Sequence, residues 1–508
     1  MSVGAYSVAG KPSKDGLPVE NVENQASMAT DFSVVLDDED ISYGQGGIRG
    51  IIASPYVFGA AFLASMGGFS SGYDQGVISI VNVMPKFHQT FPRTETAFGK
   101  GFMTGMLELG AFIGCLFMPT LVDKIPRKNA LSIVVVIFNI GAIMQTASNS
   151  YGLLIAGITI GGIGVGTLAM PIYISEIAPP NLRGTLLVLE SVSCVLGVVV
   201  SFWITYATRE LCGELSFRLP FGLQMVCSTI LGIGIHFFPY SPRWLALVNR
   251  PDDALESLER LRRLPRTDPR VQKEHVAICN EVAFQRLIQE KLHPGVAGLK
   301  LEILSWGDLF KKSRSTGLLS RLELHSSSNS LGSMPLYTMP QPSFSHWASH
   351  RLVAVTVCFF IIHKVGRRPL AIWGGIGGRT AWGIMAVLVG VFSDKWSSNA
   401  AAGWAAVAMT FCFILIYGVS YAPPGWALPA EVFSNASRSK GVALATATVW
   451  LFNFIVGVAT PPMIESIGFG VYIFFGSCWC LAFFLVPKTK GKTLEQIDEI
   501  FGEHAAQE

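Results

Sequence analysis

Residues 99–148 read GKGFMTGMLELGAFIGCLFMPTLVDKIPRKNALSIVVVIFNIGAIMQTAS. The stretch contains two apolar segments, 99–122 and 130–148, joined by the charged loop DKIPRK (123–128). Each segment is long enough to cross a hydrocarbon core of roughly 30 Å as a helix. Because loops rich in lysine and arginine stay on the cytoplasmic side of a membrane, the stretch predicts two transmembrane helices connected in the cytoplasm.

Apolar segments of this kind recur along most of the chain. Only 14% of the 508 residues are charged and 50% are hydrophobic, whereas about a quarter of an ordinary soluble protein is charged. The remaining segments lie near 55–84, 152–174, 185–208, 219–238, 352–362, 371–392, 403–428, 441–464 and 470–486. We therefore expect an all-α polytopic membrane protein and exclude an ordinary cytosolic enzyme.

The charge balance and the cysteines exclude several other classes of protein. The net charge is +3, and the 38 lysines and arginines do not gather into a face that could bind nucleic acid. The nine cysteines are scattered without the spacing of metal ligands. No phosphate-binding loop and no nucleophile–base pair is present. We expect no enzymatic activity, no metal, no cofactor and no disulfide framework.

Basic residues also predict the orientation and organisation of the chain. They follow alternate apolar segments, which places both termini in the cytoplasm. The expected units are a disordered cytoplasmic tail (1–54), an N-terminal six-helix half (55–240), a cytoplasmic helical insert (241–312), an anomalous segment (313–350), an incomplete C-terminal half (351–486) and a cytoplasmic C-terminal tail (487–508). Leu255, Leu258 and Leu261 recur at helical spacing within the insert, as amphipathic helices require.

A set of short motifs occurs in a fixed order along the chain. The motifs are GGFSSGYDQG (67–76), DKIPRK (123–128), GGIGVG (161–166), YISEIAPPNLRG (173–184), PYSPRWL (239–245), KVGRRPL (364–370), PPGWALPAEVF (423–433), NF (453–454) and PKTKGKTLEQID (487–498). The ordered set resembles the sugar porter family of the major facilitator superfamily, especially fungal hexose and pentose transporters. The resemblance implies a helical bundle of two halves, with about 11 recognisable spans of an expected 12.

The resemblance also assigns a cytoplasmic gate to charged residues at the ends of helices. In the family, such residues hold the two halves together in the outward-open state and separate when the cytoplasmic side opens. The matching residues are Asp123, Arg127, Glu176, Arg183, Arg243, Arg367, Arg368, Glu431 and Arg438. The alternative is that these charges only set the orientation of the helices in the membrane.

Carboxylates within the apolar segments are candidates for proton coupling. Asp74 lies in the first segment, where a charge is costly unless it is paired, hydrated or protonated. By resemblance it matches the aspartate that carries the proton in symporters of the family. The alternative is a residue at a helix end that faces water. Glu108 and Glu190 are further carboxylates of this kind, and we include Glu190 in the proton-coupling set.

The resemblance places a sugar site between the two halves. Trp426 follows a Pro-Pro-Gly break and matches a tryptophan that stacks on the sugar ring. Asn453 matches a sugar-binding asparagine, and Gln75 is a further candidate contact. Ser191 lies where family members usually have a sugar-binding glutamine. The alternatives are an aromatic residue at the membrane interface for Trp426 and a helix-packing amide for Asn453.

One substitution departs from the family at the proton site. Family members have an arginine before the GGxGVG motif that stabilises the charged aspartate, and this chain has Ile158 there. The implied function is transport of a monosaccharide with a proton, by a monomer in the plasma membrane that contacts lipid. The alternatives are a facilitative uniporter, a sugar sensor, or an inactive chain that reflects a gene-model error.

The anomalous segment suggests a shift of reading frame. Basic residues place both 243–325 and 364–368 in the cytoplasm, yet only the short segment 352–362 separates them. The family has its seventh span and a QQ-x-x-G-x-N sugar motif there, whereas residues 313–350 are rich in serine and proline and cannot span a membrane. If each codon takes the last base of the preceding one, Ser327 to Ser349 can encode FQQFTGINALVYYAPTIFLALGL.

Part of this alternative reading is fixed by the genetic code. The codons of Met334 and Met339 must end in G, so Pro335 and Pro340 both become alanine. Sequencing the transcript across codons 310–365 tests the hypothesis. We expect the shifted frame to encode the seventh span, and codons that do not spell the motif would refute the idea.

Overall fold

The computed structural model describes residues 55–82, 84–165, 183–296, 298–308, 367–392, 399–420 and 438–475, with isolated positions between 173 and 179, between 350 and 357, and at 477. These residues form helices and no strand, so the predicted all-α class is confirmed. Trp426, Glu431, the two predicted tails and all but the last residue of the anomalous segment lie outside the described residues.

Six helices make up the first half of the bundle. They are α3 (Pro55–Val81), α5 (Ala97–Lys124), α6 (Arg127–Thr146), α7 (Tyr151–Val165), α9 (Arg183–Thr208) and α10 (Leu215–Gly234). Helix α3 packs on α9 and α10, α7 packs on α5 and α6, and α6 packs on α10. Each helix overlaps one predicted apolar segment. Two short elements, α4 (Pro85–Thr90) and η1 (Pro92–Glu95), connect α3 to α5 and were not predicted.

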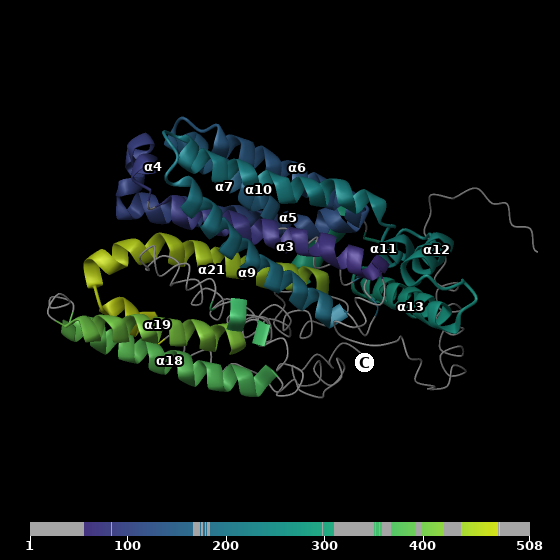
Figure 1. Cartoon of the computed structure of the whole chain (residues 1–508). Coiled ribbons are helices and arrows are strands. Elements are labelled where there is room, and N and C mark those ends of the chain that lie inside the picture. The colour runs from purple at the N-terminus through teal and green to yellow at the C-terminus, as the bar shows by residue number, and fades with distance from the viewer. Residues whose placement is uncertain are drawn as a thin grey trace, which may run out of the picture.

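Three long helices are described in the second half. Helices α18 (Arg367–Phe392) and α19 (Ala400–Ser420) lie side by side, while α21 (Arg438–Ile467) packs along α5 of the first half. Figure 1 shows α21, in yellow, between the first-half helices and the pair α18 and α19. The α5–α21 contact is therefore a principal connection between the two halves.

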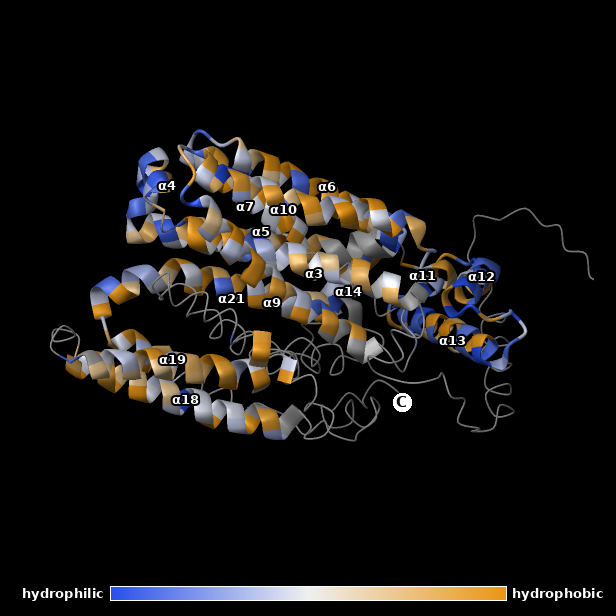
Figure 2. Ribbon diagram, in the orientation of Figure 1, coloured by the Kyte–Doolittle hydropathy of each residue, from blue (hydrophilic) through white to orange (hydrophobic). Residues whose placement is uncertain are grey.

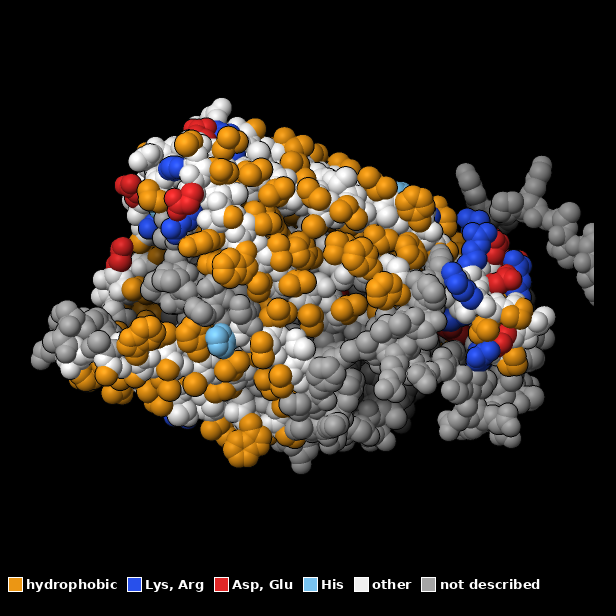
Figure 3. All heavy atoms as spheres, viewed as in Figure 1, with side chains coloured by type: hydrophobic (Ala, Val, Ile, Leu, Met, Phe, Trp, Pro, Cys, Tyr) orange, Lys and Arg blue, Asp and Glu red, His pale blue; other side chains and the backbone are white. Residues whose placement is uncertain are grey.

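The described helices have the length and composition of membrane spans. Seven of them are long and apolar enough to cross a membrane, namely α5, α6, α9, α10, α18, α19 and α21, and α7 is a shorter apolar helix. Hydrophobic side chains cover the visible face of the bundle, and charged side chains gather at its two ends (Figures 2 and 3). This distribution fits a multi-pass membrane protein.

A group of polar helices follows the first half at one end of the bundle. It consists of α11 (Pro242–Leu247), α12 (Pro251–Arg262), α13 (Pro269–Leu292) and α14 (Gly298–Asp308). Ser241 and Asp268 cap the first turns of α11 and α13, since each side chain accepts a backbone N–H. Leu258 and Leu261 are buried, as their predicted helical spacing requires.

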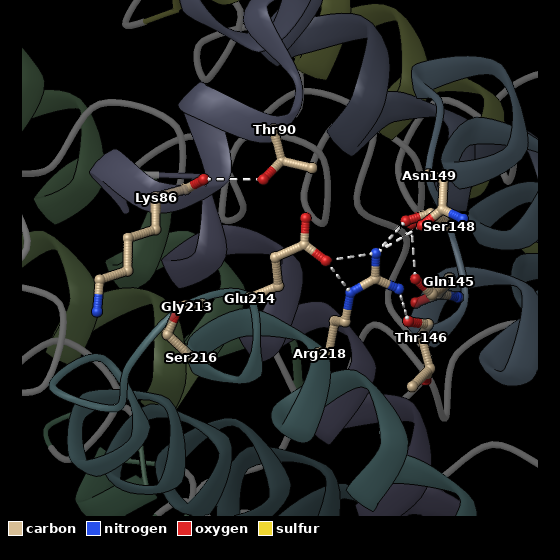
Figure 4. A network of polar contacts seen from close by, with 10 residues as sticks. All are labelled: Lys86, Thr90, Gln145, Thr146, Ser148, Asn149, Gly213, Glu214, Ser216 and Arg218. Atoms are coloured by element: carbon tan, nitrogen blue, oxygen red, sulfur yellow. Dashed lines mark hydrogen bonds and ion pairs between the residues drawn. The ribbon is translucent and has the colours of Figure 1, made fainter.

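At the opposite end of the first half, an arginine on α10 forms hydrogen bonds to the turn after α6. Arg218 on α10 donates hydrogen bonds to the carbonyl oxygens of Thr146 (2.6 Å) and Ser148 (2.8 Å) and to Asn149 Oδ1 (2.8 Å). It also pairs with Glu214 at 2.9 Å (Figure 4). One guanidinium therefore joins the start of α10 to the turn after α6.

Glycines allow α3 and α9 to approach closely. A Cβ on Gly72 would lie 1.8 Å from the carbonyl oxygen of Cys194, and a Cβ on Gly76 would lie 1.9 Å from Ser201 Oγ. Small residues of this kind let membrane helices pack backbone against backbone, where van der Waals contact replaces the missing hydrophobic driving force. Gly72 and Gly76 of the first motif are thus required by packing.

Replacing Gly72 by alanine should push α3 away from α9. We expect G72A to lose about 1–3 kcal/mol of folding free energy, because the new methyl group overlaps backbone that cannot move alone. Thermal unfolding of the purified protein in detergent measures the effect. Gly383→Ala on α18 is the matched control, since nothing lies within 4 Å of its Cβ position. Equal unfolding temperatures for the two variants would contradict this account.

Candidate functional site

Asp74 lies inside the first half, in the middle of the packed helices. Its side chain is fully buried, and neither carboxylate oxygen has a hydrogen-bond partner among the described residues. The carboxylate faces α7, because a Cβ on Gly161 would lie 3.9 Å from Asp74 Oδ2. A water-facing residue at a helix end, the alternative prediction, does not fit this burial.

Ile158 occupies the neighbouring part of α7, where the family arginine is expected. Its side chain is fully buried in an apolar cluster with Tyr73, Leu107 and Phe217. The cluster closes over the position from which a guanidinium would reach Asp74. The charge of Asp74 therefore has no compensating arginine from this turn of α7.

Two glutamines lie near Asp74 and were missed by the sequence analysis. Gln224 Nε2 on α10 donates to Gln145 Oε1 on α6 at 3.1 Å, and Gln145 Nε2 donates to the Gly157 carbonyl oxygen at 3.3 Å. A Cβ on Gly161 would lie 3.0 Å from Gln145 Nε2, so this amide approaches the same point of α7 as Asp74. Both glutamines lie within apolar segments of the sequence, and this position could have identified them as buried contacts between helices.

Glu108 and Asn453 meet at the contact between the two halves. The two side chains are 6% and 8% exposed, and the Asn453 amide on α21 donates a hydrogen bond to the Glu108 carboxylate on α5. Asp74 lies within electrostatic reach of Glu108, so the two carboxyl groups are neighbours. This contact fits the helix-packing alternative for Asn453, and the pairing with Glu108 was not predicted.

Glu190, on α9, packs against a different face of α3 from the one that carries Asp74. A Cβ on Gly68 would lie 2.6 Å from the Glu190 carbonyl oxygen, so this part of α9 meets α3 six residues before Asp74. Asp74 faces α7, and the structure does not bring these two carboxylates together. Gln75 and Ser191 adjoin Asp74 and Glu190 in sequence, on α3 and α9, and both are partly exposed.

A buried ion pair lies where α6 begins. Arg127 Nε is 3.2 Å from Glu176 Oε2, and the two side chains are 4% and 6% exposed. Ser241 Oγ, which caps α11, donates to the same Glu176 oxygen at 2.6 Å. Two of the predicted gate residues, Arg127 and Glu176, are therefore brought together with the start of the polar helices.

Arg243, another predicted gate residue, pairs within the polar helices. Its Nη2 lies 3.0 Å from Glu281 Oε1 on α13. The buried pair of Arg262 and Glu274, at 2.6 Å, was not predicted, and Arg262 also donates to the Ile177 carbonyl oxygen at 2.8 Å. The Arg262 contact fixes the polar helices to Ile177, and the separation of these partners in sequence left no local signal for them.

The remaining gate residues are placed by their helices alone. Asp123 lies in the last turn of α5, Arg183 begins α9, Arg367 and Arg368 begin α18, and Arg438 begins α21. Their side chains lie outside the description. Near the start of α21, Lys440 Nζ is 3.3 Å from Glu302 Oε1, and Trp306 packs against Ala445. Helix α14 thus contacts the second half.

Comparison with known proteins decides the family. A profile described as "Sugar (and other) transporter" matches residues 60–306 and 348–501. The chain belongs to this sugar transporter family. The unmatched interval, 307–347, overlaps the anomalous segment of the sequence analysis. The predicted membership of the sugar porters is confirmed, and with it the identity of the chain as a membrane transport protein.

Named relatives and solved structures agree with this assignment. The chain is 30% identical to a high-affinity glucose transporter of Kluyveromyces lactis, covering 88% of this chain and 85% of the relative. It is 30% identical to the high glucose sensor RGT2 of Saccharomyces cerevisiae, covering 86% of this chain and 59% of the sensor. The proton:xylose symporter XylE, bound to 6-bromo-6-deoxy-D-glucose, has the same fold, with a TM-score of 0.70, 21% identity and coverage of 88% and 99%.

Removing Arg127 should destabilise this sugar transporter family member. We expect R127A to cost about 3–5 kcal/mol, because it leaves the Glu176 carboxylate buried without its cation. Arg260→Ala is the control, since its pair with Glu256 is 64% and 42% exposed and such pairs contribute at most about 1 kcal/mol. Thermal unfolding in detergent compares them. A double variant, Arg127→Met with Glu176→Leu, should recover part of the lost stability. Equal losses of stability for R127A and R260A would contradict the view that Arg127 and Glu176 form a stabilising buried pair.

Proposed function

We propose that this chain carries a monosaccharide across a membrane together with a proton, by exposing a central site to each side in turn. The observation that carries the proposal is the Asp74 carboxylate, fully buried in helix α3 inside the bundle with no hydrogen-bond partner among the described residues. A carboxylate at such a position is costly unless it is hydrated, paired or protonated. Proton binding from one side and release to the other is therefore the natural use of Asp74.

The sugar site lies between the two halves in this proposal. The glucose transporter among the relatives and the sugar-bound structure of the same fold support a monosaccharide as substrate. Asn453 on α21 supplies a buried amide, and Gln75 and Ser191 supply partly exposed polar groups from α3 and α9. Trp426 completes the site by stacking on the sugar ring.

The cytoplasmic gate is formed by the charged helix ends. Arg127 and Glu176 join the start of α6 to Ser241 at the start of the polar helices, and Arg243 pairs within those helices. We assign the partners across the halves to the other predicted gate residues, namely Asp123, Arg183, Arg367, Arg368, Glu431 and Arg438. Breaking these contacts opens the site to the cytoplasm. The protein acts as a monomer in the plasma membrane, with both termini in the cytoplasm.

A facilitative uniporter is the second candidate function, and Ile158 favours it. Without a cation beside Asp74 among the described residues, the charged form of the carboxylate gains no electrostatic stabilisation, and release of the proton is disfavoured. A transporter whose aspartate keeps its proton moves sugar down its gradient only. The relative named as a glucose sensor adds a third reading, in which sugar binds without net transport.

Asp74→Asn separates symport from uniport. In a symporter, D74N should lose accumulation of labelled D-glucose against its gradient, so that the inside-to-outside ratio falls to about 1, while sugar exchange at equal concentrations continues. Uptake into proteoliposomes with an inward proton gradient measures both quantities. Asp253→Asn on the polar helix α12 is the control. Accumulation that persists in D74N would refute the role of Asp74, and a chain that never accumulates sugar would favour the uniporter.

A further inference from the structure

The contact between α5 and α21 is antiparallel and close along its length. A Cβ on Gly105 would lie 3.1 Å from the Phe454 ring, and nearer the other end of α5, Cys115 clusters with Trp450. Glu108 lies between these two points, opposite Asn453. A carboxylate therefore sits in the middle of an otherwise apolar seam that joins the two halves.

Glu108 depends on a single neutral donor. The Asn453 amide satisfies one part of the carboxylate, and Oε2 has no hydrogen-bond partner among the described residues. One amide hydrogen bond offsets only a small part of the desolvation free energy of a buried, charged carboxylate. Loss of that amide would leave the charged form with no compensation from α21.

The elements packed on α5 bring no described cation to Glu108. Asp74 on α3 is the titratable group whose charge acts on it. Helix α7 meets this part of α5 through Gly162, whose Cβ position is 2.3 Å from the Leu107 carbonyl oxygen. The 3-10 helix η1 comes just before α5 in the sequence, and α6 comes just after it, so both lie at the ends of α5. The neighbourhood of Glu108 is thus neutral or negative.

We propose that Glu108 links sugar binding to proton binding across the two halves, an inference that rests on the proposed sugar transport. With the site empty, the Asn453 amide donates to the Glu108 carboxylate and ties α5 to α21. A sugar hydroxyl that takes this amide leaves the carboxylate without its donor, and Glu108 then binds a proton from the open side. No covalent bond of the sugar changes, and the proton returns to water when the sugar leaves.

The linkage works in both directions. If sugar favours protonation of Glu108, protonation must favour sugar binding by the same factor. Protonated Glu108 holds the Asn453 amide less strongly, because a hydrogen bond to a neutral acid is weaker than one to a carboxylate. Because Glu108 and Asn453 belong to different halves, the same event loosens the seam between them.

Sugar-linked proton uptake by the full chain tests this inference. Purified protein in weakly buffered detergent with a pH indicator is mixed with D-glucose, and D-glucose affinity is measured from pH 5 to 8. The unaltered protein should take up a proton on binding, with affinity falling by up to about tenfold per pH unit above the protonation midpoint. Glu108→Gln should bind D-glucose with no proton uptake and no such pH dependence.

Companion variants separate this role from a structural one. Glu108→Asp keeps the acid and should retain proton uptake. Glu108→Met fills the site without charge and serves as a second neutral variant where E108Q does not fold. Glu465→Gln, an exposed carboxylate on α21, is the matched control.

Different results would overturn the role of Glu108 and the proposed sugar transport. Proton uptake that persists in E108Q or E108M overturns the inference while sugar transport stands. Uptake that disappears in D74N and persists in E108Q assigns the linked proton to Asp74 instead. An unaltered protein that shows no saturable D-glucose binding overturns the proposed function, and the inference falls with it.

Discussion

The close seam between α5 and α21 is the contact on which the rest of the structure depends. It joins the two halves together with a second apolar cluster, which Val195 and Phe202 of α9 share with Trp382 of α18. Lipid gives helices no hydrophobic reason to associate. Small residues such as Gly101 and Gly105 on α5 let the two backbones approach, so van der Waals contact holds the seam. A seam of this kind can open and close, because its energy comes from fit and few polar bonds secure it.

The two ends of the first half are secured differently from its middle. At one end, Arg218 donates hydrogen bonds to two carbonyl oxygens of the turn after α6. At the other end, Glu176 binds both Arg127 and Ser241. Between them the helices touch mainly through glycine and apolar side chains, with a few buried amide contacts such as that of Gln224 with Gln145. The polar contacts at the two ends therefore hold the helices of the first half to one another.

The sequence predicted the spans well and the pairings between them poorly. The segments 99–122 and 371–392 became α5 (Ala97–Lys124) and α18 (Arg367–Phe392), because helix length in a bilayer is set by local hydropathy. Asp74 could be identified alone, since an acid in an apolar segment is visible without a structure. The partners of Glu108 and Gln145 could not, because α5–α21 and α6–α10 contacts join residues far apart in sequence.

The burial of Ile158 makes the departure from the family arginine difficult to reverse. The side chain fills a closed cluster with Leu107, Leu154 and Phe217, all without significant exposure. An arginine there would need extra volume and a path for its charge, and added atoms in a filled core are costly. Placing an arginine there would take several coordinated substitutions. Among the described residues, Asp74 therefore lies beside an apolar side chain where the family has a cation.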